Sequence, residues 1–177
     1  MPCRRFKPDA ALNELRSVKY IDAHGLQPWQ NSLMGEVDNR DDDYYIHIVY
    51  SEQGNIGKTV LCEWMEAKGL AFEIPTGNKN DIMQWVHRNK CGTYTVDFPR
   101  AVPKRNITEF CVVLEAVRKG KIYYKKGRGV TFEYIDGPNV VVFTTTLPDP
   151  EHLSPQRWKY WTVEGVDGSL TLQPLRR

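Results

Sequence analysis

Residues 44–59 read Tyr-Tyr-Ile-His-Ile-Val-Tyr-Ser-Glu-Gln-Gly-Asn-Ile-Gly-Lys-Thr, and this stretch decides the fold of the 177-residue chain. Its first seven residues are β-branched or aromatic apart from one histidine, which is typical of a buried strand. A helix is expected to begin at Lys58, because apolar side chains follow at helical spacing and Gly69 is a natural stop. The residues between them form a loop that joins the end of a strand to the start of a helix.

The segment Gly54-Asn55-Ile56-Gly57-Lys58-Thr59 has the composition and the context of a phosphate-binding loop. Backbone N–H groups of such a loop, together with the N-terminus of the next helix, surround phosphate oxygens. Lys58 would reach the terminal phosphates as a point charge, and the hydroxyl of Thr59 would bind Mg²⁺. Glu52 stands where the usual pattern has a glycine, so we expect its carboxylate to point outward. The alternative is an ordinary turn with a helix cap.

Strands and helices alternate along the rest of the chain. Residues 1–40 are expected to be helical, with Leu12, Leu15 and Val18 on one face and a second helix beginning at Pro28. Strands are expected over residues 70–74, 93–98, 140–144 and 158–163, helices from a cap at Asn80 and over residues 107–118, and a hairpin over residues 121–134. This order predicts a three-layer α/β domain with a mostly parallel sheet, whose ligands bind beyond the carboxyl ends of the strands.

Asp97 ends the expected strand 93–98, so its carboxylate would lie at the same edge of the sheet as the loop. A carboxylate there can hold Mg²⁺ opposite Thr59. The alternative is a turn or capping aspartate. Many ATPases place a second acid beside this one to orient water, but here Phe98 follows. Glu115 is a possible substitute, with an ion-pair role on a helix surface as the alternative.

The bulk composition excludes several classes of protein. The formal net charge of +2 is too small to identify a nucleic-acid partner. The four cysteines (Cys3, Cys62, Cys91 and Cys111) form no CxxC pair, so we expect reduced thiols and neither a zinc site nor a disulfide framework. No apolar run approaches the roughly 20 residues that span a bilayer, and the first residues lack the apolar segment of a secretory signal. We expect a protein of the cytosol or nucleus with no membrane partner.

Six motifs in a fixed order carry a resemblance to a known family. They are Leu26-Gln27-Pro28-Trp29-Gln30, the loop at residues 54–59, Val96-Asp97-Phe98-Pro99-Arg100, Leu114-Glu115-Ala116-Val117-Arg118-Lys119-Gly120, Pro138-Asn139-Val140-Val141-Val142-Phe143, and Pro148-Asp149 with Leu153-Ser154-Pro155-Gln156-Arg157-Trp158. Together they resemble the superfamily 3 helicase domain of replication-initiator (Rep) proteins from circular single-stranded DNA viruses. The resemblance covers about residues 26–163.

The resemblance implies an AAA+-like P-loop NTPase that hydrolyses ATP with Mg²⁺ and moves on single-stranded DNA during rolling-circle replication in the host nucleus or cytosol. It also implies a homo-oligomeric ring, usually of six subunits. By matching position, Lys58 and Thr59 are the Walker A pair and Asp97 is the Walker B acid. Arg157 resembles the arginine finger offered to a neighbour's ATP, and its alternative is a surface ion pair. The family's sensor asparagine is replaced by Thr145, which offers fewer hydrogen bonds than an amide.

Basic and aromatic residues alternate in the expected hairpin. Lys125, Lys126 and Arg128 lie at its tip beside Gly127 and Gly129, and Tyr123, Tyr124, Phe132 and Tyr134 are interleaved with the basic residues. Basic side chains can follow phosphates while aromatic rings stack on bases, and the resemblance places a DNA-contacting hairpin here. The alternative is a solubilising lysine-rich turn with its tyrosines in the core.

The resemblance divides the chain into a helical linker or oligomerisation segment at residues 1–40, an ATPase domain at residues 41–165, and a polar tail at residues 166–177. Rep proteins of this family usually carry a nicking domain with paired histidines before the helicase. The four histidines here are scattered, so we expect that domain to be absent from this chain and present in a full-length protein. Two other functions remain open: a nucleotide-switched nucleic-acid-binding module with little turnover, and an RNA-directed superfamily 3 helicase.

Overall fold

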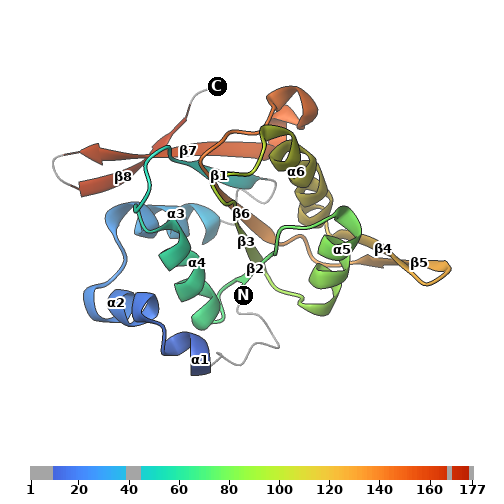
Figure 1. The fold of residues 1–177 in the computed structure, drawn as a ribbon, viewed down its shortest axis with the longest axis horizontal. Helices are drawn as coiled ribbons and strands as arrows, with labels where there is room; N and C mark the ends of the chain where they lie inside the picture. Colours follow the sequence, from blue (N-terminus) through green and yellow to red (C-terminus); the bar gives the residue numbers. More distant parts are fainter. Residues whose placement is uncertain (1–9, 39–44, 167–168, 176–177) are drawn as a thin grey trace.

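A six-stranded sheet lies between two layers of helices in the computed structural model, which describes residues 10–38, 45–166 and 169–175 (Figure 1). The strand order is β2-β3-β6-β1-β7-β8, and all neighbours are parallel except β7 and β8. The strands are β1 (Ile46–Tyr50), β2 (Phe72–Glu73), β3 (Thr93–Asp97), β6 (Asn139–Thr144), β7 (Trp158–Val166) and β8 (Ser169–Pro174). A separate antiparallel hairpin, β4 (Lys121–Lys126) with β5 (Gly129–Tyr134), extends beyond α5.

The helices pack on both faces of the sheet. The helices are α1 (Ala10–Asn13), α2 (Arg16–His24), α3 (Pro28–Asp38), α4 (Lys58–Ala67), α5 (Lys79–Arg88) and α6 (Lys104–Arg118), with short 3₁₀ turns η2 (Pro150–His152) and η3 (Pro155–Arg157). Helices α3 and α4 cover one face of the sheet, and helices α5 and α6 cover the other. Within the described ranges, no helix has the length and apolar character needed to cross a bilayer. The predicted three-layer α/β arrangement is confirmed.

Strand β6 shows how the two layers are held on the sheet. Val140 and Val142 belong to the core beneath α5 and α6, whereas Val141 and Phe143 belong to the core beneath α3 and α4. Successive side chains of a strand point to opposite faces, so a central strand covered on both sides must be apolar throughout. Each such side chain contributes about 1.5–3 kcal/mol when fully buried. The continuous run Val-Val-Val-Phe therefore marks a central strand.

The N-terminal helices dock on α4 within the same chain. Val18 is fully buried, and Asp22 accepts hydrogen bonds from Trp64 Nε1 (3.1 Å) and Lys68 Nζ (2.7 Å). The expected start signals at Pro8 and Asp9 lie outside the described residues. At least this part of residues 1–40 therefore packs on α4, the helix that follows the loop at residues 54–59.

Four sequence expectations differ from the structure. The expected strand 70–74 is only β2, although Ile74 N still donates to the carbonyl of Thr95 on β3 (2.8 Å). The cap of α5 is Asn78, whose side chain accepts from Asp81 N, whereas Asn80 Oδ1 accepts from Lys125 N (2.6 Å) and so holds the hairpin. Strand β7 runs beyond residue 163, and β8 follows it as a further strand that the sequence did not indicate. Leu170 and Leu172 of β8 pack on the core beneath α3, which explains why this polar segment pairs.

The cysteine expectation holds only in part. Cys62 and Cys111 are buried free thiols, as expected. Cys91 is disulfide-bonded, so the expectation of reduced thiols throughout is wrong at this position. Sequence spacing could not reveal this bond, because a disulfide depends on proximity in space.

Glu115 joins α6 to the chain entering β7. Its carboxylate accepts hydrogen bonds from Ser154 N (2.8 Å), Ser154 Oγ (2.8 Å) and Trp158 Nε1 (2.9 Å), and it contacts Arg157 at 3.3 Å. Burial alone raises the pKa of Glu115, but the hydrogen bonds from Trp158 and Ser154 outweigh it, so the pKa is lowered overall. The carboxylate is thus stabilised in its ionised form.

Removing this carboxylate is expected to destabilise the fold. Glu115→Ala leaves the indole N–H of Trp158 and the amide of Ser154 without an acceptor, which costs about 1–3 kcal/mol. Chemical denaturation monitored by tryptophan fluorescence would measure the loss. Glu109→Ala, on the exposed side of α6 in an ion pair with Arg105, is the matched control and should change stability by less than about 0.5 kcal/mol. Equal losses in the two variants would contradict this role of Glu115.

Candidate functional site

One cleft of about 400 Å³ lies beyond the carboxyl ends of the parallel strands. Its lining includes Gly54, Asn55, Ile56, Gly57, Lys58 and Thr59, together with Asp97 and Thr145. These residues come together because β3, β6 and β1 are neighbours, so the segments that follow them open on the same edge of the sheet. Eight predicted site residues therefore share one concave surface.

The backbone of the loop turns twice into the left-handed region. Asn55 has φ 61° and Gly57 has φ 88°, conformations that asparagine and glycine tolerate best. Gly57 also caps α4, whose first turn follows at once. Among the described residues, no acceptor receives a hydrogen bond from the backbone N–H groups of residues 54–59. Such a set of N–H groups at a helix N-terminus favours an anion.

Helix α3 holds the loop from behind. Trp29 is fully buried, and its indole Nε1 donates to the carbonyl of Ile56 (3.1 Å). The side chain of Gln30 donates to the carbonyl of Gly57 (3.1 Å) and accepts from Gln27 N (2.8 Å). The φ of Gly57 favours glycine, and a Cβ there would also make a tight contact with Gln30 Nε2 at 3.1 Å. The motif at residues 26–30 is thus a structural support for the loop.

Thr59 and Asp97 meet across the cleft. The hydroxyl of Thr59 donates to Asp97 Oδ2 at 2.5 Å, which joins the first turn of α4 to the end of β3. Lys58 Nζ lies 3.4 Å from the carbonyl of Ser51. Burial lowers the pKa of Lys58. The negative charge of Asp97 opposes this effect, and the positive charge of Arg100 adds to it. The cleft thus combines a lysine ammonium with a paired hydroxyl and carboxylate.

Arg100 is a cleft residue to which sequence reasoning assigned no role. A Cβ at Gly54 would lie 1.6 Å from its guanidinium Nη2, so Arg100 packs directly on the loop backbone. A side chain at Gly54 would therefore displace the Arg100 guanidinium from its present position. Glu52 is exposed and accepts from the Tyr50 hydroxyl (2.6 Å), so it points outward as expected. The only sequence signal for Arg100 was its place three residues after Asp97.

Glu73 is the second cleft residue that sequence reasoning missed. It lies on β2, and its side chain lines the cleft with Asp97. Burial is the largest effect, and with the carboxylates of Asp97, Glu66 and Glu63 it raises the pKa of Glu73 to about 7. The available signal was a single acid within the otherwise apolar segment Leu70-Ala71-Phe72-Glu73-Ile74.

Arg157 and Glu115 do not belong to this cleft. Arg157 lies in η3 and contacts Glu115, so the proposed substitution of Glu115 for a missing water-orienting acid is wrong. Its carboxylate is occupied by Ser154, Trp158 and Arg157. About one third of the Arg157 side chain remains exposed, so it is available to a second molecule.

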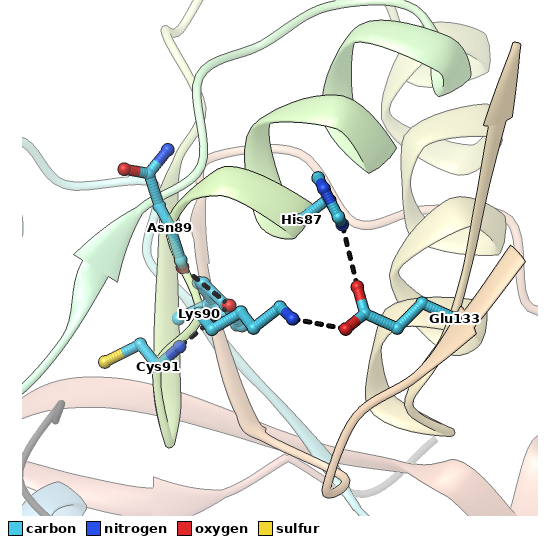
Figure 2. Close-up of polar contacts among 6 residues, drawn as sticks. His87, Asn89, Lys90, Cys91 and Glu133 are labelled. Carbon is cyan, nitrogen blue, oxygen red and sulfur yellow. Dashed lines mark hydrogen bonds and ion pairs between the residues drawn. The ribbon is translucent and has the colours of Figure 1, made fainter. Parts of the chain in front are cut away.

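The β4–β5 hairpin forms a second candidate surface. Lys125, Lys126 and Arg128 are all exposed at its tip, and Gly127 adopts φ 61° in the turn. Figure 2 shows how the base of the hairpin is held: His87 (2.7 Å) and Lys90 converge from the end of α5 on Glu133 of β5. The base is therefore anchored, and the basic side chains at the tip are exposed although the backbone of Lys125 is bonded to Asn80 and Gln84.

The hairpin's aromatic residues divide between its two faces. Tyr124 is buried against His87, with ring centroids 5.1 Å apart. Tyr123 stacks on Phe132 (6.3 Å), whose edge meets Tyr134 (5.0 Å), and Phe132 and Tyr134 are exposed. Lys79 lies over the ring of Tyr123 at 4.3 Å. One face thus belongs to the core, and the other presents rings beside basic groups.

Comparisons with known proteins identify Rep-like relatives. No protein-family model matches the chain. It is 28% identical over 138 residues to Para-Rep C10 of Milk vetch dwarf C10 alphasatellite, covering 77% of this chain and 48% of the relative. It is 25% identical over 158 residues to Para-Rep C9 of Faba bean necrotic yellows C9 alphasatellite, covering 88% and 55%. Para-Rep C7 of Faba bean necrotic yellows C7 alphasatellite is 27% identical over 136 residues, covering 76% and 47%.

These similarities support a viral replication-associated protein of the Rep-like kind. The identities are low, and the chain spans about half the length of the curated relatives it matches. The coarser part of the predicted resemblance is therefore supported. A helicase activity requires a separate argument from the site.

Glu73→Gln is expected to stabilise the fold more at high pH than at low pH. The folded-state pKa lies above that of the unfolded chain, so the parent is stabilised at low pH and loses that stabilisation as the pH rises through about 7. The neutral amide has no such loss. Melting temperatures measured without nucleotide should therefore diverge between about pH 5 and about pH 8.

Glu164→Gln is the control for this comparison, because Glu164 is exposed on β7. It should follow the parent at every pH. A Glu73→Gln difference that is the same at both ends of the pH range would contradict the environment assigned to Glu73.

Proposed function

We propose that this chain is an ATP-hydrolysing, AAA+-like superfamily 3 helicase domain of a viral Rep protein, which moves on single-stranded DNA during rolling-circle replication. The observation that carries the proposal is the single cleft into which the loop at residues 54–59, Asp97 and Thr145 all open. The strand order, with one strand between β1 and β3, supports it because it brings the loop and the acid to facing sides of that cleft.

The loop and Lys58 would bind the phosphates of ATP. The unpaired N–H groups of residues 54–59 and the N-terminus of α4 would receive phosphate oxygens. Lys58 would place its ammonium against the terminal phosphates, and Arg100 adds a second positive charge in the same cleft. Two cations and a helix N-terminus match the charge of a nucleoside triphosphate.

Thr59 and Asp97 fit a magnesium ion. Their paired oxygens are a hydroxyl and a carboxylate, the hard donors that Mg²⁺ prefers. No cluster of three or more His, Cys, Asp or Glu side chains suited to a metal occurs within the described ranges, and Mg²⁺ at nucleotide sites takes its other ligands from phosphates and water. When bound, the ion neutralises charge on the β- and γ-phosphates. Thr145 would contact the terminal phosphate through its hydroxyl.

Arg157 would act between subunits. It lies outside its own cleft, and its side chain is one-third exposed, so it could reach the nucleotide of a neighbour in a ring, with six subunits as the expected number. Its planar and always charged guanidinium suits charge that develops on a transferring phosphate. Glu115 would hold the arginine in position in each subunit.

The hairpin would follow the DNA. Lys125, Lys126 and Arg128 supply exposed positive charge to phosphates, and Phe132 and Tyr134 supply exposed rings to bases. The clamp at Glu133 would connect this movement to α5 and the core. We propose that the protein acts in the nucleus or cytosol of the host cell.

A second function rests on one observation. Phe98 occupies the position after Asp97, so the usual second acid is missing from the strand end. A module that switches with nucleotide and hydrolyses it slowly is therefore the alternative. RNA in place of DNA is a further alternative, which competition between the two single strands would decide.

Lys58→Ala is expected to lower ATP turnover at least about 100-fold, because it removes a charge that stabilises the transferring phosphate. Phosphate release should be measured with single-stranded DNA present, and the melting temperature should show that the fold persists. Lys104→Ala, at the exposed start of α6, is the matched control and should turn over like the parent.

Three outcomes are distinct. Turnover by Lys58→Ala equal to that of the parent would show that the site assignment is wrong. Tight ATP binding by the parent with negligible turnover would favour the nucleotide switch. Absence of nucleotide binding would exclude both functions.

Replacing the hairpin cations Lys125, Lys126 and Arg128 together by alanine is expected to weaken binding to single-stranded DNA and to make its salt dependence shallower. Three lost phosphate contacts reduce the slope of log K against log salt by about 2. Fluorescence anisotropy at several salt concentrations measures the slope. A control with Lys19, Lys104 and Arg105 replaced by alanine removes the same charge elsewhere; an equal change in slope there would rule out a specific role for the tip.

A further inference from the structure

The strand end that holds Asp97 has no second acid to orient water. Phe98 is 5% exposed, and its ring meets that of Phe110 edge-on at 5.1 Å, so this position belongs to the core. Glu115 is bound to Ser154, Trp158 and Arg157 and does not line the cleft. ATP hydrolysis in this cleft therefore needs its water-orienting group from another element.

Glu73 is placed to supply that group. It pairs in register with Thr95 of β3, two residues before Asp97, so it sits at the same end of the adjacent parallel strand. Glu73 and Asp97 are the two carboxylates in the lining of the cleft within the described ranges. Asp97 is bonded to Thr59, whereas Glu73 has no hydrogen-bond or ion-pair partner among the described residues.

An unpaired, half-buried carboxylate beside other acids is unfavourable for folding. Its cleft also holds Lys58 and Arg100, but both cations lie with the phosphate loop, where they face the nucleotide in the proposed function. A free carboxylate oxygen in the lining of this cleft is an acceptor for a water molecule. The cost to stability is what is expected where a residue is retained for chemistry.

We propose that Glu73 is the catalytic base of this cleft, and the proposal rests on the ATP hydrolysis proposed above. Glu73 accepts a hydrogen bond from a water molecule and aligns its oxygen with the γ-phosphorus. The water oxygen forms the new bond to phosphorus with its lone pair, and the bond from phosphorus to the β–γ bridging oxygen breaks. ADP leaves with that electron pair, and the proton of the water passes to the Glu73 carboxylate, which later releases it to solvent.

Glu73→Gln separates this role from nucleotide binding. The amide keeps the size of the side chain but cannot take the proton, so phosphate release should fall at least about 100-fold. The affinity for a non-hydrolysable ATP analogue, measured by titration of the full chain with single-stranded DNA, should stay within about 3-fold of the parent, because Glu73 makes no phosphate contact. Glu73→Asp keeps a carboxylate on a shorter side chain and should give intermediate turnover. Glu164→Gln is the control and should match the parent.

The outcomes distinguish this inference from the proposed function. If the parent hydrolyses ATP and Glu73→Gln turns over within about 3-fold of it, the role of Glu73 is overturned. The proposed ATPase function then stands. Loss of analogue binding in Glu73→Gln also overturns it, since Glu73 would then be a binding or structural residue. A parent without turnover overturns both. Slow turnover with retained binding supports Glu73 as the base.

Discussion

Two hydrogen bonds from α3 to the loop at residues 54–59 are the constraint on which the rest of the site depends. Trp29 and Gln30 bind the carbonyls of Ile56 and Gly57, and both donors are buried. With those carbonyls bonded behind the loop, its N–H groups remain without a protein acceptor among the described residues. A buried donor that loses its acceptor is costly, so the loop is held in one shape. The positive φ angles at Asn55 and Gly57 are stable for this reason.

Parallel strand order converts this local shape into a site. Because β3, β6 and β1 are neighbours with the same direction, Asp97, Thr145 and the loop meet at one edge of the sheet. The hairpin is inserted between α6 and β6 but stays outside the sheet, which separates the exposed basic tip from the cleft. The contacts of His87 and Lys90 with Glu133 attach the base of the hairpin to the end of α5.

The charges of the cleft favour function over stability. Besides burial, the charge of Arg100 lowers the pKa of Lys58 and the charge of Asp97 raises the pKa of Glu73, so like charges act on each other within the cleft. Each arrangement is unfavourable for folding, and each is favourable for a ligand that carries phosphates and an activated water. Glu115 shows the contrasting case, since the hydrogen bonds that its carboxylate accepts from Ser154 and Trp158 support the fold. The relatives, all Para-Rep proteins at low identity, support a replication-associated role for a chain with these features.

The amino-acid sequence by itself determined the three-layer class, the strand–loop–helix unit at residues 44–59, and the candidate residues that follow apolar strands. These features depend on neighbours in the chain: a buried run such as Val140–Phe143, or glycines next to a helix start. Only the tertiary structure decided that Trp29 bonds to Ile56 and that Arg100 packs on Gly54. It also decided that Glu73 lines the cleft, whereas Glu115 bonds to Trp158 outside it. It also decided β8, whose polar sequence pairs because Leu170 and Leu172 reach the core. These contacts join segments that are far apart in the chain, and they are set by strand register and helix packing, which no local pattern of residues encodes.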